Sequence, residues 1–408
     1  MDLWGAAARF PGLRREQDGR RVVFADAPGG SQVPDAVVEA MSEYLTHSNA
    51  NAHGAFATSQ ETDHVVEEAH RAAADLLNAD ADEVVFGPNA TTLLFAISRS
   101  IARTLEPGDE VVVTRLDHDA NVRPWVLAAE DLGATVRWVD VREEDVTLDV
   151  ESFAAALSER TRVVAFTLAS NAVGTVTPAA DLVRIVRDRT PDAIVACDGV
   201  HVAQHRSIDV REIGADVVVC SPYKIFGPHL GILFGRRELL SALRPYKVRP
   251  AEDALPYAFE TGTQNHEAFA GWIAAVGYLA ELGGGGRRAA ARAAFERAIV
   301  PWEAELSRRF LDGIGAIPSV RLYGIAEPER ASERTPTFAI RVADQHPGDT
   351  AKRLADRGIY VWDGNYYALE IMERLGLEDS GGAVRVGFCH YNTPAEVDRV
   401  LEELAALG

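Results

Sequence analysis

Residues 215–228 carry the sequence Ala-Asp-Val-Val-Val-Cys-Ser-Pro-Tyr-Lys-Ile-Phe-Gly-Pro. The apolar run Val217–Cys220 has the length and composition of a buried strand, and a glycine and a proline close the turn after it. Lys224 therefore lies just beyond a strand end. A second apolar run, at 193–197, leads directly into Asp198. A lysine and a carboxylate thus follow the ends of two successive predicted strands.

Residues from about 80 to 240 alternate short apolar segments with amphipathic ones. The predicted strands are Glu83–Phe86, Glu110–Thr114, Thr135–Val139, Thr161–Leu168, Ala193–Cys197, Val217–Cys220 and Gly231–Phe234. The predicted helices between them are Thr91–Leu105, Asn121–Leu132, Val150–Ser158 and Ala179–Arg189. This alternation predicts an α/β fold with a mostly parallel, seven-stranded sheet and helices on both faces. Ligands of such sheets bind beyond the carboxyl ends of the strands, which is where Asp198 and Lys224 are expected.

Lys224 and Asp198 together fit a pyridoxal phosphate site. A lysine can form a Schiff base with the aldehyde of this cofactor, and a carboxylate can hold its pyridinium nitrogen protonated, so that the ring accepts electrons. Either residue alone is more often a surface lysine or an ordinary strand-end aspartate. The pair, in this order at two strand ends, favours the cofactor.

Two further segments are suited to holding a phosphate. Residues 86–93, Phe-Gly-Pro-Asn-Ala-Thr-Thr-Leu, lead from a strand into a helix, whose free amides and dipole attract anions. Thr91 and Thr92 would add hydroxyl donors, and ordinary N-capping by Asn89 is the alternative. Residues 259–265, Phe-Glu-Thr-Gly-Thr-Gln-Asn, form a second Gly/Thr-rich loop before a helix.

Three polar residues near other predicted strands extend this site. His118, within Asp-His-Asp-Ala-Asn at 117–121, is a candidate to stack on a flat cofactor; metal ligation and a solvated loop are the alternatives. Asn171 is placed to donate to the phenolic oxygen of the cofactor or to form an Asx-turn. Arg385 lies inside an apolar strand, where a substrate carboxylate is a natural bidentate partner and an internal Asp or Glu is the alternative.

The composition excludes several classes of protein. A net charge of -20 over 408 residues argues against nucleic acid or an anionic membrane as partner. Cys197, Cys220 and Cys389 lie in apolar runs and cannot form a disulfide framework, and no Cys/His spacing is typical of zinc, so we expect no metal. Residues 1–5 do not resemble the start of a signal peptide, and no apolar run approaches a membrane span. We therefore expect a cytoplasmic protein.

The pattern changes after Asn265. An apolar helix ends in four glycines at 283–286, and a long helix is predicted from about Arg287 to Ile314. Strands and helices are mixed beyond it, which is typical of a smaller α+β domain. We expect an N-terminal arm (1–20) that packs on the small domain, a large cofactor-binding α/β domain (21–282) and a small C-terminal α+β domain (283–408).

Taken together, these motifs resemble the class V aminotransferase family of fold-type I pyridoxal phosphate enzymes, and within it the cysteine desulfurase-like branch. The resemblance runs from about Val22 to Thr393 and implies a homodimer with two active sites at its interface. It implies catalytic roles for Lys224, His118 and Asp198. It implies cofactor contacts from Asn89, Ala90, Thr91, Thr92, His118, Asn171, Asp198, His201, Ser221, Tyr223, Lys224 and, toward the neighbouring subunit, Thr263. It implies substrate contacts from Arg385, Asn171, Tyr367 and Asn365.

Three departures separate the chain from the desulfurases it resembles. His201 and Tyr223 stand where desulfurases usually carry Gln and His, and both replacements keep the ability to form hydrogen bonds. In the loop 361–368, Val-Trp-Asp-Gly-Asn-Tyr-Tyr-Ala, Trp362 and Tyr367 occupy the places of an arginine and of the cysteine that takes sulfur as a persulfide. Neither side chain can accept sulfur.

Two enzymatic activities are compatible with these residues, together with one non-catalytic role. The first is a lyase that cleaves the carbon–sulfur bond of a cysteine or an S-cysteinyl conjugate by β-elimination, which needs the cofactor but no thiol nucleophile. The second is decarboxylation, oxidative deamination, transamination or epimerisation of an amino acid, as in natural-product pathways. A scaffold that has lost chemistry is the third, and the retention of both Lys224 and Asp198 argues against it.

Overall fold

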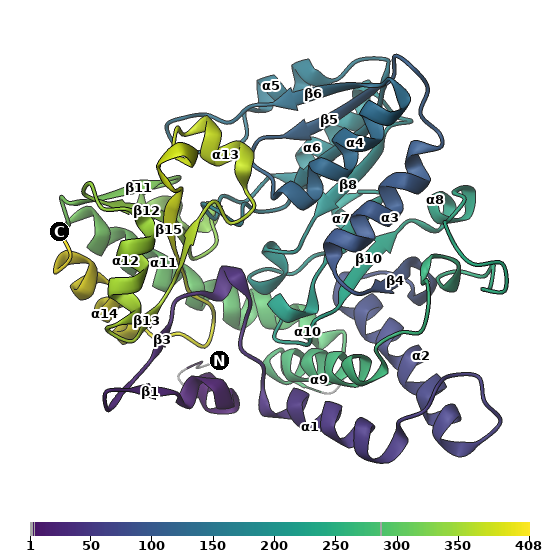
Figure 1. The fold of residues 1–408 in the computed structure, drawn as a ribbon, viewed down its shortest axis with the longest axis horizontal. Coiled ribbons are helices and arrows are strands. Elements are labelled where there is room, and N and C mark those ends of the chain that lie inside the picture. The colour runs from purple at the N-terminus through teal and green to yellow at the C-terminus, as the bar shows by residue number, and fades with distance from the viewer. Residues whose placement is uncertain (1–2, 4, 286–287) are drawn as a thin grey trace.

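The computed structural model describes residue 3, residues 5–285 and residues 288–408. Its main sheet has seven strands, in the order β4-β10-β9-β8-β7-β5-β6, and only β10 runs antiparallel to its neighbours (Figure 1). The strands are β4 (Val84–Gly87), β5 (Glu110–Thr114), β6 (Thr135–Val139), β7 (Thr161–Thr167), β8 (Ile194–Asp198), β9 (Val217–Cys220) and β10 (Gly231–Gly235). The prediction of a mostly parallel seven-stranded sheet is confirmed.

Helices cover both faces of this sheet, which explains why its inner strands are apolar along their whole length. Successive residues of a strand point to opposite faces, so Val111 and Val113 of β5 join one core cluster and Val112 joins another. On the Val111 face lie α3 (Ala90–Ala102), α4 (Arg123–Leu132) and α8 (Arg237–Ala242). On the other face lie α2 (Ala57–Leu77), α5 (Val150–Ala156), α6 (Ala179–Arg189), α7 (Val210–Ile213) and α9 (His266–Leu282).

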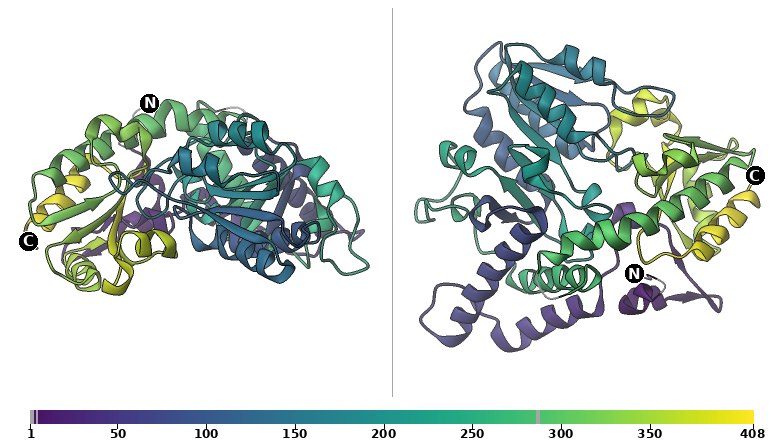
Figure 2. Two further views of the ribbon diagram at one scale, coloured as in Figure 1. Left: turned by 90° about the horizontal axis from the view of Figure 1, so that it is seen from above. Right: turned by 180° about the vertical axis from the view of Figure 1, so that it is seen from behind.

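A second, antiparallel sheet forms the smaller C-terminal lobe, which lies beside the main sheet (Figure 2). Its order is β11-β12-β15-β14, with β11 (Val320–Tyr323), β12 (Thr337–Val342), β14 (Trp362–Gly364) and β15 (Ala383–Gly387). Against it pack α11 (Val300–Gly315), α12 (Pro347–Ala355) and α14 (Pro394–Ala405), and α13 (Leu369–Arg374) lies toward the main sheet. A capping box between Thr393 and Glu396 begins α14.

The N-terminal segment contacts both lobes. Two short strands, β1 (Glu16–Gln17) and β2 (Arg20–Arg21), form a hairpin, and β3 (Val23–Phe24) pairs in parallel with β13 (Ile359–Tyr360) of the small lobe. The chain then passes to α1 (Asp35–Glu43), which packs against α9. The division of the chain at residues 20 and 282 stays a prediction.

The prediction of one long helix at 287–314 is wrong, because the segment is divided. The structure has a short α10 (Ala290–Ala294), a π-helical turn at Phe295–Ile299 and then α11. Pro301 lies at the start of α11 and has no N–H to bond the preceding turn, which explains the widened turn before it. The expected helix start at Arg287, and the last of the four glycines, lie outside the described residues.

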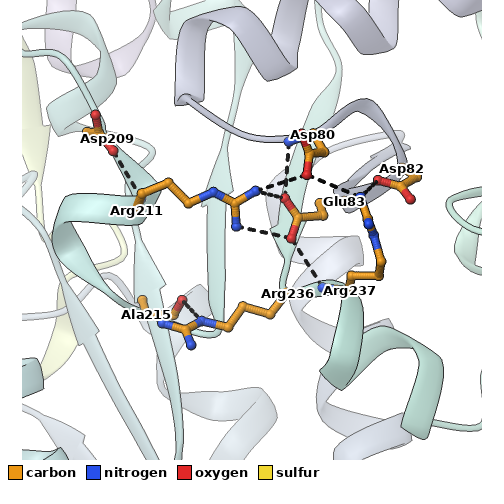
Figure 3. Close-up of polar contacts among 8 residues, drawn as sticks. All are labelled: Asp80, Asp82, Glu83, Asp209, Arg211, Ala215, Arg236 and Arg237. Atoms are coloured by element: carbon orange, nitrogen blue, oxygen red, sulfur yellow. Dashed lines mark hydrogen bonds and ion pairs between the residues drawn. The ribbon is translucent and has the colours of Figure 1, made fainter.

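A cluster of charged side chains joins three elements at the amino end of the parallel strands (Figure 3). Glu83, buried just before β4, accepts two hydrogen bonds from the guanidinium of Arg211 on α7. Arg237 on α8 lies 2.7 Å from Asp82 and 3.1 Å from Asp80. In this cluster every carboxylate has a cationic partner. Separately, none of the described helices is long and apolar enough to cross a membrane.

Candidate active site

A cavity of about 850 Å³ opens between the carboxyl ends of the parallel strands and the small lobe. Its walls come from the turns after β5, β7, β8 and β9, from the start of α3, from the N-terminal segment and from β14 and β15. The predicted site residues that line it are Asn89, Ala90, Thr91, His118, Asn171, Asp198, His201, Ser221, Tyr223, Lys224, Asn365, Tyr367 and Arg385. The topology thus brings together residues spread over nearly 300 positions of the sequence.

Lys224 lies in a 3-10 turn directly after β9 and is almost fully buried. Its Nζ donates to the backbone carbonyl of Pro28 at 2.7 Å. Burial, and after it repulsion from Arg385, lower the pKa of Lys224 to about 7, although Asp198 opposes both effects. A lysine with a pKa near neutrality is a better nucleophile and proton carrier than an exposed one.

Asp198 is the last residue of β8 and is likewise buried. Its Oδ1 accepts a hydrogen bond from the backbone N–H of Val200 at 2.8 Å. Burial raises the pKa of Asp198 to about 6, against the opposing effects of the Val200 amide and of Lys224. The carboxyl group is therefore ionised at neutral pH, and it lies on the wall of the same cavity as Lys224.

His118 follows β5, and its ring forms another wall of the cavity. Nδ1 accepts a hydrogen bond from the N–H of Ala120 at 3.0 Å. Burial lowers the pKa of His118 to about 3, with Lys224 and Arg385 adding repulsion, so the ring is neutral. The ring of Tyr367 lies nearly parallel to it, with centroids 5.6 Å apart and an angle of 22°. A neutral, flat imidazole is suited to stacking. Among the described residues, no group of His, Cys, Asp and Glu is arranged to hold a metal.

The start of α3 serves two purposes. Oδ1 of Asn89 accepts from the N–H of Thr92 at 2.8 Å, which is the ordinary N-cap. Asn89, Ala90 and Thr91 also line the cavity, so the amino end of the helix faces it. Thr92 is exposed and does not line the cavity. Ser221, buried after β9, lines the cavity as well.

Arg385 is buried in β15 without a carboxylate within ion-pair distance among the described residues, so an internal Asp or Glu partner is not what the structure shows. One terminal nitrogen donates to the carbonyl of Asn171 at 2.9 Å, and Nε has no partner. The guanidinium lies 4.4 Å from the ring centre of Tyr366. Burial lowers the pKa of Arg385 to about 10, which leaves it charged. A buried, incompletely bonded guanidinium in a cavity wall is suited to an anionic ligand.

Arg334 is a second buried arginine, and its hydrogen bonds can be compared with those of Arg385. It is also buried and has no carboxylate partner among the described residues, but its nitrogens donate to the carbonyls of Ile325, Val173, Thr337 and Thr335. Its hydrogen-bonding capacity is therefore used within the protein. That of Arg385 is used only in part, since Nε is unpaired and one terminal nitrogen donates to Asn171.

Asn171 and His201 each keep one buried polar atom that has no hydrogen-bond partner among the residues that the structure describes. Nδ2 of Asn171 donates to the carbonyl of Tyr366 at 3.0 Å, and its Oδ1 is unpaired. Nε2 of His201 lies 3.1 Å from Oγ1 of Thr335, and its Nδ1 is unpaired. Buried polar atoms are rarely left unpaired unless a ligand or water meets them. Both residues line the cavity.

The loop after β14 carries an unusual backbone. Tyr366 and Tyr367 have φ values of 55° and 57°, a left-handed conformation that is uncommon for aromatic residues. Two hydrogen bonds from Asn365 support it, because Oδ1 accepts from the N–H of Tyr367 at 3.1 Å and Nδ2 donates to Glu378 at 2.9 Å. Tyr367 remains 74% exposed at the mouth of the cavity.

Two residues expected at the site lie elsewhere or meet other partners. Thr263 is exposed and outside the cavity, so its expected contact with a neighbouring subunit's phosphate stays a prediction. Tyr223 lines the cavity, and its ring stacks on His229 with centroids 5.1 Å apart.

Sequence reasoning missed two contributors. The backbone carbonyl of Pro28 accepts a hydrogen bond from Lys224, which lies 196 residues further along the chain. No local sequence pattern predicts this contact. Asp117, the residue before His118, is fully buried. Its carboxyl group accepts hydrogen bonds from Thr114 and, at 2.7 Å, from Asn121, and burial raises its pKa to about 8. The spacing of Asp117 and Asn121, four residues apart and joined through the 3-10 turn Asp119–Asn121, was the available signal.

These features fit pyridoxal phosphate. A helix start and Ser221 lie where a phosphate is expected, Asp198 supplies a carboxylate for a ring nitrogen, and Lys224 supplies an amine. The unpaired atoms of Asn171 and His201 supply hydrogen-bonding partners for ring substituents. The cofactor contributes a conjugated ring that accepts electrons from a substrate carbon.

Comparison with known proteins agrees with this assignment. The family model "Aminotransferase class-V" matches residues 23–400. The chain is 32% identical over 428 residues to a "Probable cysteine desulfurase" of Streptomyces coelicolor (99% of this chain, 96% of the relative). It is 31% identical over 409 residues to an "Aminotransferase-like protein" of Gibberella zeae (97% of this chain, 96% of the relative).

A solved cysteine desulfurase from Thermococcus onnurineus NA1 has the same fold, with a TM-score of 0.86, 27% identity and 98% of each chain covered. The cysteine desulfurase CsdA of Escherichia coli gives a TM-score of 0.84 at 26% identity, covering 100% of this chain and 98% of the other. The chain therefore belongs to the class V aminotransferase family, and it is a pyridoxal phosphate-dependent enzyme of fold-type I.

Proposed function

We propose that this enzyme cleaves the carbon–sulfur bond of a cysteine or an S-cysteinyl conjugate by β-elimination, without a persulfide cysteine. The observation that carries the proposal is the position of the thiols. Cys197, Cys220 and Cys389 are all buried within or directly after strands, and burial raises the pKa of each thiol. A persulfide-forming enzyme needs a mobile, accessible thiolate, and Tyr367 occupies the mouth of the cavity instead.

Each side chain of the cavity has a separate role in the proposed reaction. Arg385 would bind the substrate carboxylate, which fixes the amino acid in the cavity. Lys224 would anchor the cofactor and carry protons, because its pKa is close to neutrality. Asp198 would keep a positive charge on the ring nitrogen, and His118 would cover the ring face. The bound cofactor supplies the electron sink.

We also propose a homodimer with active sites at its interface. Large apolar side chains are exposed on or near α1, namely Val38, Leu45 and Phe56. The loop with Thr263 is exposed in the single chain, as expected for a contact made with a second copy. Sedimentation of the purified protein at several concentrations tests this proposal, and a monomer at all of them would reject it.

A second reaction class keeps the cofactor and changes the bond that breaks. The similarity to an aminotransferase-like protein of Gibberella zeae favours this alternative. It includes transamination, decarboxylation, oxidative deamination and epimerisation of an amino acid, as a step of a natural-product pathway.

A substrate screen distinguishes the two. Cofactor-loaded protein would be incubated with cysteine, cystine, S-alkyl cysteines and simple amino acids, and the products identified by mass spectrometry. Pyruvate together with a released thiol supports the lyase. Carbon dioxide, a keto acid that retains the substrate skeleton, or an inverted α-carbon supports the second class and rejects the first.

A further inference from the structure

A chain of buried hydrogen bonds brackets the turn that carries His118. The indole Nε1 of Trp125 on α4 lies 3.2 Å from Oδ1 of Asn121, and Nδ2 of Asn121 lies 2.7 Å from Oδ1 of Asp117. The hydroxyl of Thr114, the last residue of β5, bonds the other oxygen of Asp117. These four side chains are almost fully buried. The chain therefore joins a strand end to a helix, with His118 between them.

The direction of the two bonds of Asn121 follows from the atoms involved. An indole N–H can only donate, so Asn121 presents its carbonyl oxygen to Trp125. The amide nitrogen of Asn121 must then face Asp117, where it donates to Oδ1. This assignment holds whether or not the other oxygen of Asp117 carries a proton. Both ends of the Asn121 side chain are thus used, and its orientation is fixed.

The turn that Asn121 closes holds the imidazole of His118 through a backbone amide. The N–H of Ala120 donates to Nδ1 of His118 at 3.0 Å, and a backbone N–H can only donate. Nδ1 therefore carries no proton, and Nε2 carries the proton of the neutral ring. The N–H of Asn121 also donates to the carbonyl of His118 at 2.9 Å, so Asn121 closes the turn with its backbone as well as its side chain.

The same turn is bonded to the loop at the mouth of the cavity. The N–H of Asp119 donates to the carbonyl of Tyr367 at 2.6 Å, and the ring of Tyr367 lies beside that of His118. Tyr367 is exposed, whereas the partners of the Asn121 side chain lie in the core. Removal of that side chain would release the buried end of the turn, and the Ala120 amide would then move relative to the imidazole.

We propose that Asn121 is a positioning residue for His118. Held between Trp125 and Asp117, it fixes the turn whose Ala120 amide sets the orientation of the imidazole and the nitrogen that carries its proton. His118 then presents its ring to the cofactor in a single orientation. The proposal rests on His118 as a cofactor contact and not on which substrate bond is broken, so a failed substrate screen would leave it intact.

A double-mutant cycle with His118→Ala and Asn121→Ala tests the proposal without any substrate. His118→Ala should raise the dissociation constant of pyridoxal phosphate about two- to tenfold, the effect of one lost aromatic contact. It should also weaken the visible circular dichroism of the bound cofactor, which reports asymmetric contacts on its ring. Asn121→Ala should change both quantities in the same direction, with a rise of about two- to fivefold in the dissociation constant.

The double variant decides whether Asn121 acts through His118. Its dissociation constant and dichroism should match those of His118→Ala alone, because the ring that Asn121 positions is already absent. Effects that add in the double variant would overturn the proposal, since Asn121 would then act independently of His118. Either single variant with both quantities unchanged would overturn it as well.

Asn78→Gly is the matched control. Nδ2 of Asn78 also donates to a carboxylate, that of Asp209 at 2.8 Å, and neither residue lines the cavity. Glycine accepts the left-handed backbone of Asn78, whose φ is 57°. This variant should be less stable, but its cofactor affinity and dichroism should be those of the unchanged protein. A loss of dichroism equal to that of Asn121→Ala would overturn the proposal, because any lost Asn–Asp bond would then have the same effect.

A second variant covers the case in which Asn121→Ala does not fold. Trp125→Phe removes only the indole donor and keeps an aromatic ring in the core. The dichroism of the bound cofactor should weaken in the same direction as in His118→Ala, by a smaller amount, and the change should vanish in the His118→Ala background. An unchanged dichroism in folded Trp125→Phe would overturn the proposal.

Discussion

Two groups of charged residues lie at opposite ends of the main sheet, and they are built in different ways. At the amino end, Arg211 and Arg237 each meet carboxylates, and buried Glu83 is fully paired (Figure 3). At the carboxyl end, Lys224 and Arg385 are more deeply buried, and within the described part of the chain their hydrogen bonds go to backbone carbonyls and not to carboxylates. Charges that are mutually neutralised hold elements together. Buried charges that bond no carboxylate directly are costly to stability, and an anionic ligand can provide the missing partner.

The largest effect is expected for Lys224→Ala. The change removes both the covalent attachment point of the cofactor and the proton carrier, so turnover should fall by at least about a thousandfold. Borohydride reduction of the loaded protein followed by peptide mapping checks the attachment. A label on another lysine would show that Lys224 is not the lysine that reacts with the cofactor.

Asp198→Asn should have the next largest effect. The shape is nearly unchanged, but the charge that keeps the ring nitrogen protonated is lost. We expect cofactor affinity to weaken by about 1.5–3 kcal/mol and turnover to fall further than affinity does. Spectroscopic titration and steady-state kinetics measure the two quantities. Equal losses in both would make Asp198 an anchor without an electronic role.

Arg385→Met tests the comparison most directly. It should lower kcat/KM for amino-acid substrates about a hundredfold, since a charge-assisted, bidentate contact is lost. The melting temperature should not fall, because Met replaces a buried, unpaired charge. A marked loss of stability would mean that Arg385 is a structural residue like Arg334.

Arg211→Met is the matched change at the other end of the sheet. It leaves Glu83 buried without its main partner, so the free energy of unfolding should fall by about 1–3 kcal/mol. Turnover of the folded protein should be unchanged. Urea unfolding measures the first quantity and steady-state kinetics the second. If activity fell with stability unchanged, the paired cluster would have a role in catalysis.

The smallest effect is expected when Cys197, Cys220 and Cys389 are all replaced by Ala. Turnover should stay within about twofold, because no thiol reaches the cavity and the change removes only buried volume. Thiol labelling after incubation with cysteine should detect no protein-bound persulfide in the unchanged protein. A persulfide that forms in the unchanged protein and is absent from the triple variant would mean that the enzyme is a persulfide-forming cysteine desulfurase.

Much of the main sheet could be predicted from the sequence, and the reason is visible in particular strands. The predicted bounds of Glu110–Thr114, Thr135–Val139 and Val217–Cys220 agree with β5, β6 and β9. Two of these are continuous apolar runs buried on both faces, a pattern that depends on local composition. The strand-end positions of Lys224 and Asp198 follow from the same runs.

The remainder depends on contacts that local sequence does not encode. The partner of Lys224 is a backbone carbonyl in a distant segment, and any residue supplies a carbonyl. Nε of Arg385 is unpaired because the fold places no acceptor from the described residues beside it, and local sequence does not show this. The turn at Phe295–Ile299 shows the opposite case, in which Pro301 gave a local signal that the helical pattern around it concealed.

The bond between Lys224 and the carbonyl of Pro28 has a consequence for how the enzyme is assembled. The amine that must react with the incoming aldehyde is already engaged by a segment that precedes α1. Binding of the cofactor would therefore require the hydrogen bond between Lys224 and the Pro28 carbonyl to break before the amine can attach to the cofactor. The residues around Pro28 should govern how fast the enzyme matures, while the residues that contact the loaded cofactor govern how firmly it is retained.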